Sequence, residues 1–185
     1  MLILRKVGFV PEVSAPLKSS KLDRGPMNWI HDSSIAEVSA LLNAITYVAH
    51  KEMFAAGIRS LLAMHDLPEV RDVLPAWPSV YNALSVICNR SSPLHQDRGT
   101  LLNGLDLLVS IGGDPKLKMD WPLFQTKVAY SSGTVVLFSG ASVPHQVSLS
   151  AIDRVCLAFY MKDEIHKWCK VGLPNRVRYG EYLPT

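Results

Sequence analysis

The chain has 185 residues, a formal net charge of +3 and 48% hydrophobic residues. This length supports a single domain over residues 1–185, and the hydrophobic content excludes an intrinsically disordered chain. The mild positive charge permits nucleic acid as a partner without indicating it. The three cysteines are odd in number and form no Cys-x-x-Cys pair, which disfavours a disulfide framework and favours a reducing, intracellular compartment. No apolar run approaches the length of a membrane span, so we expect no membrane association.

The N-terminal third of the chain predicts an irregular segment followed by helices. Residues 1–32 contain several proline and glycine breakers and are expected to be irregular. The pattern Ser34-x-x-Glu37 has the form of a capping box and predicts the start of a helix. Apolar residues then keep a helical spacing as far as Leu62, with Gly57 as a predicted bend. Such an apolar stripe is typical of a helix that supports a sheet.

The remaining part of the chain predicts mainly β structure. A short helix is expected from residue 66 to the residue before Pro75, so that residues 33–75 form the support helices. Short apolar or alternating runs then fill residues 79–163. Many short strands after helices indicate a mainly β protein with flanking helices (α+β), built on a double-stranded β-helix, or jelly roll. The predicted strands cover residues 80–88, 105–111, 123–130, 134–138, 146–149 and 154–161.

Four residues carry the strongest chemical signal: His95, Asp97, His145 and Arg154. Two imidazoles and one carboxylate form the facial triad that holds non-haem Fe(II) and leaves positions open for a co-substrate and O₂. The guanidinium of an arginine matches a carboxylate bidentately, as the far carboxylate of 2-oxoglutarate requires. The sequence therefore predicts an oxygenase.

The expected strands are compatible with this site. His95 and Asp97 are two residues apart, so in an extended segment both point to one face. His145 and Arg154 are expected to flank a hairpin around Ser150. They share a face if the loop of that hairpin has an even number of residues, whereas an odd loop without a bulge separates them.

The motif and its surroundings resemble the TET/JBP-type branch of the Fe(II)- and 2-oxoglutarate-dependent dioxygenases, especially its fungal members. The resemblance covers about residues 79 to 163. The iron motif is shared by the whole superfamily. The assignment to this branch depends on the sequence around the motif. The matching stretches are Asn89-Arg90, Pro93-x-His95-Gln-Asp97, Asn103 to Gly112, Gly133 to Gly140, Asp153-Arg154 and Ala158 to Met161.

The resemblance implies both the cofactors and the substrate. Members of this branch oxidise a methyl group on a nucleic-acid base: 5-methylcytosine, thymine or N6-methyladenine. By position, His95, Asp97 and His145 would bind Fe(II), and Arg154 would bind the C5 carboxylate of 2-oxoglutarate. O₂ is the second co-substrate, and ascorbate would serve as the reductant. Nucleic acid is then the expected partner and the nucleus the expected location; the oligomeric state is not predicted.

Two positions depart from the pattern of the family. Animal TET enzymes carry an asparagine that contacts the base three residues after the motif aspartate, where this chain has Thr100. Thr100 is a candidate substrate residue, but it lacks the bidentate amide, so we expect the pocket to tolerate a base other than 5-methylcytosine. Many relatives place serine or threonine two residues after the arginine, where this chain has Cys156, a weaker donor.

Several further residues are candidates with an ordinary structural alternative. Asn89 and Tyr160 are candidate cofactor-binding residues whose polar tips would line the cavity, with turn capping and core packing as the alternatives. Arg98 is a candidate substrate residue, or else a solvated arginine. Lys116 and Lys118 are expected in a solvated loop, with contact to nucleic acid as the alternative.

Two other functions remain open beside the nucleic-acid-base oxygenase. One is a small-molecule or protein hydroxylase of the same superfamily, and the other is a catalytically degenerate copy, against which the intact triad and arginine argue. The remaining histidines have no partners at ligand spacing, and we expect them to be surface or capping residues. These are His31, His50, His65 and His166.

Overall fold

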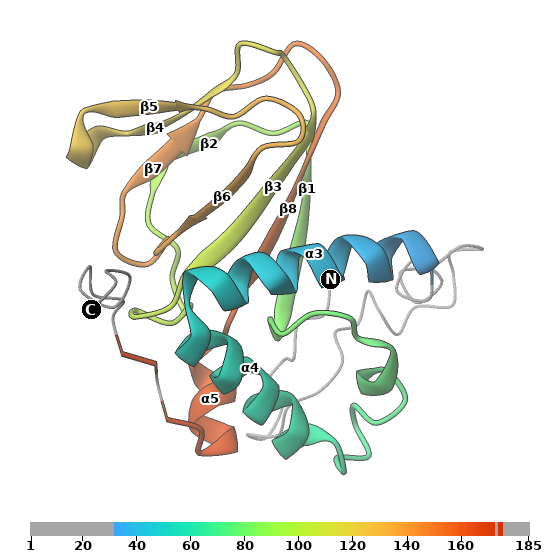
Figure 1. Cartoon of the computed structure of the whole chain (residues 1–185). Helices are drawn as coiled ribbons and strands as arrows, with labels where there is room; N and C mark the ends of the chain where they lie inside the picture. Colours follow the sequence, from blue (N-terminus) through green and yellow to red (C-terminus); the bar gives the residue numbers. More distant parts are fainter. Residues whose placement is uncertain (1–31, 173, 176–185) are drawn as a thin grey trace, which may run out of the picture.

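The computed structural model describes residues 32–172, 174 and 175. Within this range, two helices precede two antiparallel sheets, and a short helix follows the last strand (Figure 1). None of the described helices combines the length and the apolar character needed to cross a membrane. The helices are α3 (Ser33–Ala49), α4 (Lys51–Met64), α5 (Asp163–Cys169) and the 3₁₀ turns η1 (Leu74–Ala76) and η2 (Pro122–Phe124). The strands are β1 (Ala83–Cys88), β2 (Ser92–His95), β3 (Asp106–Gly112), β4 (Lys118–Trp121), β5 (Thr126–Ala129), β6 (Val135–Phe138), β7 (His145–Val147) and β8 (Arg154–Tyr160).

The strands form two four-stranded sheets that face each other. The major sheet has the order β1-β8-β3-β6, and the minor sheet has the order β2-β7-β4-β5. Every pairing within them is antiparallel. Except for β4 and β5, which form a hairpin in the minor sheet, strands adjacent in sequence alternate between layers. This is the double-stranded β-helix that the strand pattern predicts.

Alternation along β3 and β8 divides the major sheet into two chemically different faces. Leu107 and Phe159 pack on the helical side, in the larger of two hydrophobic clusters. Leu108 and Cys156 point the other way, into the smaller cluster between the sheets. Because side chains alternate along a strand, Arg154 shares the inner face with Cys156. This alternation places the polar end of β8 inside the barrel.

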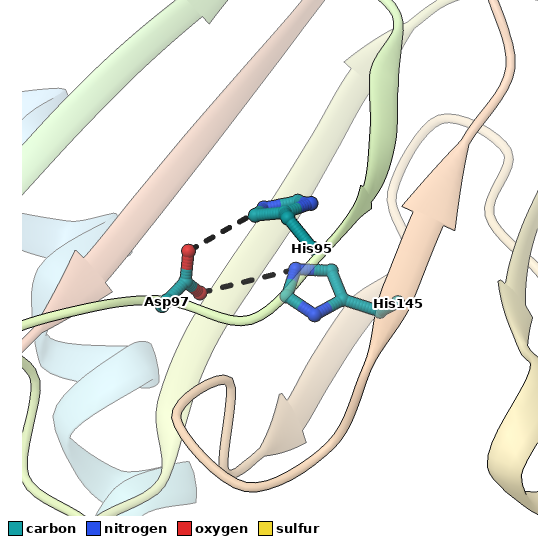
Figure 2. A group of neighbouring side chains, drawn as sticks. All are labelled: His95, Asp97 and His145. Carbon is teal, nitrogen blue, oxygen red and sulfur yellow. Dashed lines mark ion pairs between the residues drawn. The ribbon is translucent and has the colours of Figure 1, made fainter.

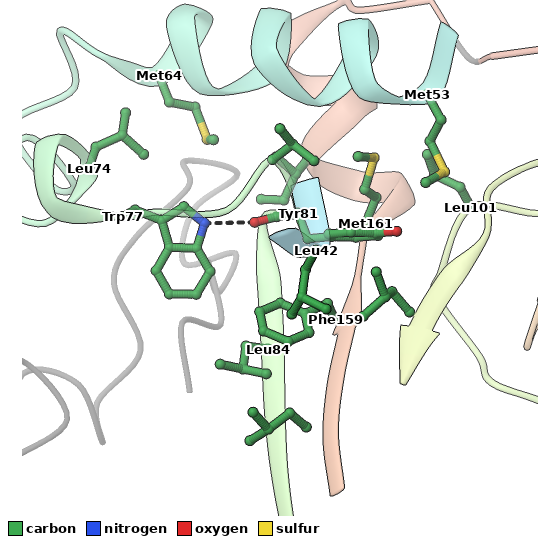
Figure 3. Close-up of a cluster of buried hydrophobic side chains, with 14 of the residues drawn as sticks. Leu42, Met53, Met64, Leu74, Trp77, Tyr81, Leu84, Leu101, Phe159 and Met161 are labelled. Atoms are coloured by element: carbon green, nitrogen blue, oxygen red, sulfur yellow. Dashed lines mark hydrogen bonds between the residues drawn. The ribbon is translucent and has the colours of Figure 1, made fainter. Parts of the chain in front are cut away.

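Helices α3 and α4 cover the outer face of the major sheet (Figure 1). Their apolar side chains meet the sheet in the cluster shown in Figure 3, where Met53 and Met64 of α4 lie with Tyr81 and Phe159. Trp77 donates a hydrogen bond from Nε1 to the carbonyl oxygen of Tyr81 at 2.7 Å. Burying each such side chain contributes about 1.5–3 kcal/mol, so this interface is a main source of stability.

The helix boundaries differ from two of the predictions. The N-cap of α3 is Asp32, whose side chain accepts a hydrogen bond from the backbone N–H of Ser34. The helix therefore does not start with a capping box at Ser34. The helical segment breaks at His50, whose Nδ1 accepts from the backbone of α4. Gly57 does not bend the chain: a Cβ there would lie 2.5 Å from the carbonyl oxygen of Val80, so glycine permits close packing.

Three predictions about the strands and connections are wrong in detail. Residues 66–75 form turns and the 3₁₀ turn η1 rather than an α-helix. The predicted strand 123–130 begins only at Thr126, and β4 occupies residues that were expected to form a loop around Lys118. The predicted hairpin around Ser150 does not exist, since β7 belongs to the minor sheet and β8 to the major sheet.

His166 is expected to be a surface or capping residue, but the structure buries it completely. Its imidazole lies 3.4 Å from the hydroxyl of Ser60 on α4. Burial lowers the pKa of His166 to about 4, Asp163 opposes that shift and Arg59 adds to it. α5 therefore packs on α4 with a neutral histidine in the interface.

We expect His166 to make stability fall as the pH decreases. The unfolded chain binds a proton near pH 6.5, whereas the folded chain resists protonation down to about pH 4. Between these values the folded state loses on the order of 3 kcal/mol relative to the unfolded state. Urea unfolding of His166→Gln across this range should show a smaller loss than the wild type. His65→Gln, at an exposed position, should retain the loss; an equal loss in both variants would contradict the assignment.

Candidate metal centre

His95, Asp97 and His145 converge on one point inside the barrel (Figure 2). Their candidate ligand atoms all lie within 4.8 Å of one another. His95 Nε2 lies 3.4 Å from Asp97 Oδ1, and His145 Nε2 lies 3.8 Å from Asp97 Oδ2. Among the described residues, no other cluster of histidine, cysteine and acidic side chains has this geometry.

A register shift in β2 aims the first histidine. Ser92 pairs with Val147 and His95 pairs with His145. Between these two pairs, β2 therefore contains one residue more than β7. Without this bulge, Leu94 would face His145; instead Leu94 is exposed. The bulge therefore brings the two imidazoles together, with ring centroids 4.2 Å apart and ring planes inclined by 50°.

Each imidazole is held in the orientation that a metal requires. The Nδ1 of His95 lies 2.7 Å from the carbonyl oxygen of Pro93, and the Nδ1 of His145 lies 3.0 Å from that of Val143. A carbonyl only accepts, so both Nδ1 atoms carry the proton and donate. Both Nε2 atoms are then free as ligands and point at Asp97. This is the usual arrangement of metal-binding histidines, so the residues fit a divalent cation.

Burial adjusts the charge around this point. His145 is 3% exposed, and desolvation lowers its pKa, which keeps the imidazole neutral as metal binding requires. Asp106, on the inner face of β3, is also buried. Burial, with the nearby charge of Asp97, raises the pKa of Asp106 to about 8. Asp106 therefore favours its neutral form, and Asp97 is the carboxyl group that faces the two imidazoles.

Gly140 holds Asp97 in place and was not identified from the sequence. Its carbonyl oxygen accepts from the backbone of Asp97 at 2.9 Å, and its own N–H donates to Asp106 Oδ2 at 3.1 Å. A Cβ at Gly140 would collide with both carboxylates. The only sequence signal was its place at the end of a family-like stretch, which does not distinguish a turn from a ligand support.

Gly140→Ala should therefore weaken metal binding without unfolding the protein. The added methyl group must displace the Asp97 carboxylate, and the loss of such a support typically costs 10–100-fold in affinity, so we expect about that decrease. Calorimetric titration with Mn²⁺ measures it, with the thermal unfolding midpoint as the control for folding. Gly172→Ala, at a glycine whose Cβ would meet nothing and whose φ is not positive, is the matched variant. Equal Mn²⁺ affinity in the two variants would contradict the role of Gly140.

Arg154 shares one cavity of about 630 Å³ with the three candidate ligands. Its side chain enters from β8 in the major sheet, whereas His95 and His145 enter from the minor sheet. Arg154 is 5% exposed, its Nε donates to the hydroxyl of Ser110 at 3.2 Å, and its guanidinium lies 4.8 Å from the Tyr130 ring centroid. Within the described part of the chain it forms no ion pair. A buried cation without a carboxylate indicates an anionic ligand.

Tyr130 and Ser110 complete the surroundings of Arg154 and were missed by the sequence analysis. The Tyr130 hydroxyl is buried 3.3 Å from the sulfur of Cys156, and burial raises the pKa of both groups. Tyr130 therefore stays a neutral hydroxyl beside the guanidinium. Strand alternation alone cannot single out these two residues. Ser110 reaches Arg154 because β3 pairs with β8 in the major sheet, and Tyr130, just after β5 of the minor sheet, reaches it only when the two sheets close.

The other predicted site residues divide into two groups. Tyr160, Arg98 and Thr100 line the cavity, and the Tyr160 hydroxyl lies 3.3 Å from that of Ser85. Asn89 does not line it. The Asn89 side chain instead accepts from the backbone of Arg154 and donates to Asp153, so it clamps the start of β8. Of the two roles expected for Asn89, capping a turn is the one that the structure shows.

Comparisons with known proteins support the fold. No model of a known protein family matches the chain, and no curated protein does either. Among solved structures, the chain is similar to NgTET1 in complex with 5mC DNA, with a TM-score of 0.62 at 11% sequence identity. The match covers 92% of this chain and 61% of that one, so the chain spans about three fifths of the neighbour's length. At this identity the likeness shows a TET-like fold.

Proposed function

We propose that this chain is an Fe(II)- and 2-oxoglutarate-dependent dioxygenase that oxidises a methyl group on a nucleic-acid base. One observation carries the proposal: a His–Asp–His cluster and a buried, unpaired arginine enter the same cavity from opposite sheets. The cluster offers three ligands to one cation and leaves further positions open. The arginine provides a separate site for the far carboxylate of a dicarboxylate. A resident metal alone would not need Arg154.

The residues of the chain would divide the work. His95, Asp97 and His145 would hold Fe(II), and Arg154 with the Tyr130 hydroxyl would orient 2-oxoglutarate through its C5 carboxylate. When bound, Fe(II) and 2-oxoglutarate would supply the electrons that activate O₂, which is the oxidant. The fixed separation between the metal ligands and Arg154 would set which end of the co-substrate faces the iron.

The choice of substrate rests on the cavity and on the structural neighbour. The volume of the cavity is sufficient for a base that has flipped out of the nucleic-acid stack, and Arg98 and Thr100 line the cavity. NgTET1 was solved with 5mC DNA, which favours the same class of substrate here. Thr100 offers one hydroxyl, so 5-methylcytosine, thymine and N6-methyladenine all remain candidate bases.

Arg154→Lys should separate binding of 2-oxoglutarate from binding of the metal. Lysine keeps the charge but loses the bidentate fork, so we expect the affinity for 2-oxoglutarate to fall about 10–100-fold. This decrease corresponds to the free energy of one or two hydrogen bonds to a charged group. Anaerobic calorimetry on the Mn²⁺-loaded protein measures this affinity directly. Mn²⁺ affinity should stay within twofold or so of the wild type, since Arg154 is not a ligand. An unchanged affinity for 2-oxoglutarate would remove Arg154 from the proposal.

The function itself is tested by mass spectrometry of modified oligonucleotides. Incubation with Fe(II), ascorbate and 2-oxoglutarate should convert a methylated base to its hydroxymethyl product or release the methyl group as formaldehyde. His145→Ala should abolish the product, because two ligands hold the metal much less tightly than three. Succinate formation that responds to a small metabolite, and to no methylated oligonucleotide, would favour a small-molecule hydroxylase. No succinate under any condition would indicate a degenerate copy.

A further inference from the structure

A second hollow, of about 530 Å³, lies on the outer face of the minor sheet. We call it the lysine groove. Its lining is mostly polar, with three lysines and one aspartate, and it faces away from the barrel. The lysine groove is lined by Ser91, Ser92, Pro93, Lys116, Lys118, Asp120, Lys127, Gln146, Val147 and Ser148.

The pairing of the minor sheet fixes which side chains enter this groove. Asp120 lies directly opposite Gln146 on β7 and Lys127 on β5. Directly opposed residues share a face, and alternation along β4 adds Lys118 to it. Met119 points to the other side and is fully buried in the inner cluster. The position of Lys118 is therefore set by a strand, not by the solvated loop expected from the sequence.

The charges in the groove do not cancel. Asp120 is its one carboxylate, and it pairs with Lys127 at 3.7 Å and accepts from Gln146 at 2.9 Å. Lys116 and Lys118 are exposed and form no ion pair with any residue that the structure describes. Two uncompensated cations, Lys118 on β4 and Lys116 in the turn before it, favour an anionic partner.

The groove borders the cavity of the metal centre. Ser92 and Val147 line both hollows, so only the β2–β7 strand pair separates them. β2 is an edge strand, and the chain passes there from Arg90, which lines the cavity, to Ser91, which lines the groove. With Arg98 at the cavity, a basic path runs from the outer sheet face over the edge at β2 to the candidate ligands.

We propose that the lysine groove binds the phosphate backbone of a nucleic-acid strand whose target base occupies the metal cavity. Lysine, serine and glutamine side chains are the usual donors to phosphates, and these types make up most of the lining. An acidic protein partner fits less well, because protein interfaces are built around aromatic and apolar anchors, which the groove lacks. The choice of nucleic acid as the polyanion rests on the proposed function. The groove binds without sequence preference, since it presents charges and hydroxyls and no stacking side chain.

Fluorescence anisotropy with a labelled, unmethylated, single-stranded oligonucleotide tests the groove without any turnover. Each lysine that contacts a phosphate contributes about 0.7 to the slope of log affinity against log salt for a single strand. The double variant Lys116→Gln and Lys118→Gln should bind more weakly at low salt and lower the slope by about 1 to 1.5. The matched control is Lys51→Gln with Lys167→Gln, which removes the same charge from α4 and α5, at the other end of the molecule (Figure 1).

The outcomes separate this inference from the proposed function. A loss of slope confined to the groove variant supports the groove, even if no oxidised base ever forms. Equal slopes in the groove and control variants overturn it, even if a methylated base is oxidised. A polyglutamate peptide that displaces the oligonucleotide as well as unlabelled DNA of equal charge would also overturn it, because the groove would then bind any polyanion.

Discussion

The antiparallel pairing of β2 with β7 is the interaction on which the candidate site depends. It places His95 opposite His145, and a bulge of one residue decides that His95, not Leu94, faces inward. Side chains alternate strictly along a strand, so a register error of one residue would expose an imidazole and bury a leucine. The short edge strand is held by few ladder bonds, and the hydrogen bond from His95 to Pro93 within the bulge adds a local constraint. A metal bound at this cluster would therefore stabilise the strand register, and the register in turn places the candidate ligands.

The major sheet carries the candidate anion-binding residue Arg154 on its inner face, while its outer face builds the hydrophobic core. Leu107 and Phe159 meet the helices, whereas Ser110 and Arg154 face the barrel from the same two strands. A buried guanidinium is costly, and it is tolerated here because Ser110 accepts one N–H and the Tyr130 ring covers one face. The hydrophobic core between the helices and the major sheet supplies folding stability that the barrel does not. This stability offsets the cost of the polar interior.

The candidate site was predictable in its residues and not in its geometry. His95, Asp97, His145 and Arg154 were identifiable because their types and spacing match the ligand and anion chemistry of one reaction. Their arrangement was not: the hairpin expected between His145 and Arg154 is absent, and the two residues meet across the barrel from different sheets. Local patterns specify which face a residue takes within its own strand, but they carry no information about which strand becomes its neighbour.

The sequence by itself determined the β-rich fold class, the helical support and the identity of the triad, because these depend on periodicity and residue type. Only the tertiary structure decided the roles of Gly140, Tyr130 and Asn89. Gly140 matters because two carboxylates pack against it, and Tyr130 because the closure of the sheets brings it under Arg154. Contacts between residues far apart in the chain arise from the packing of the layers. Local sequence patterns therefore do not predict them.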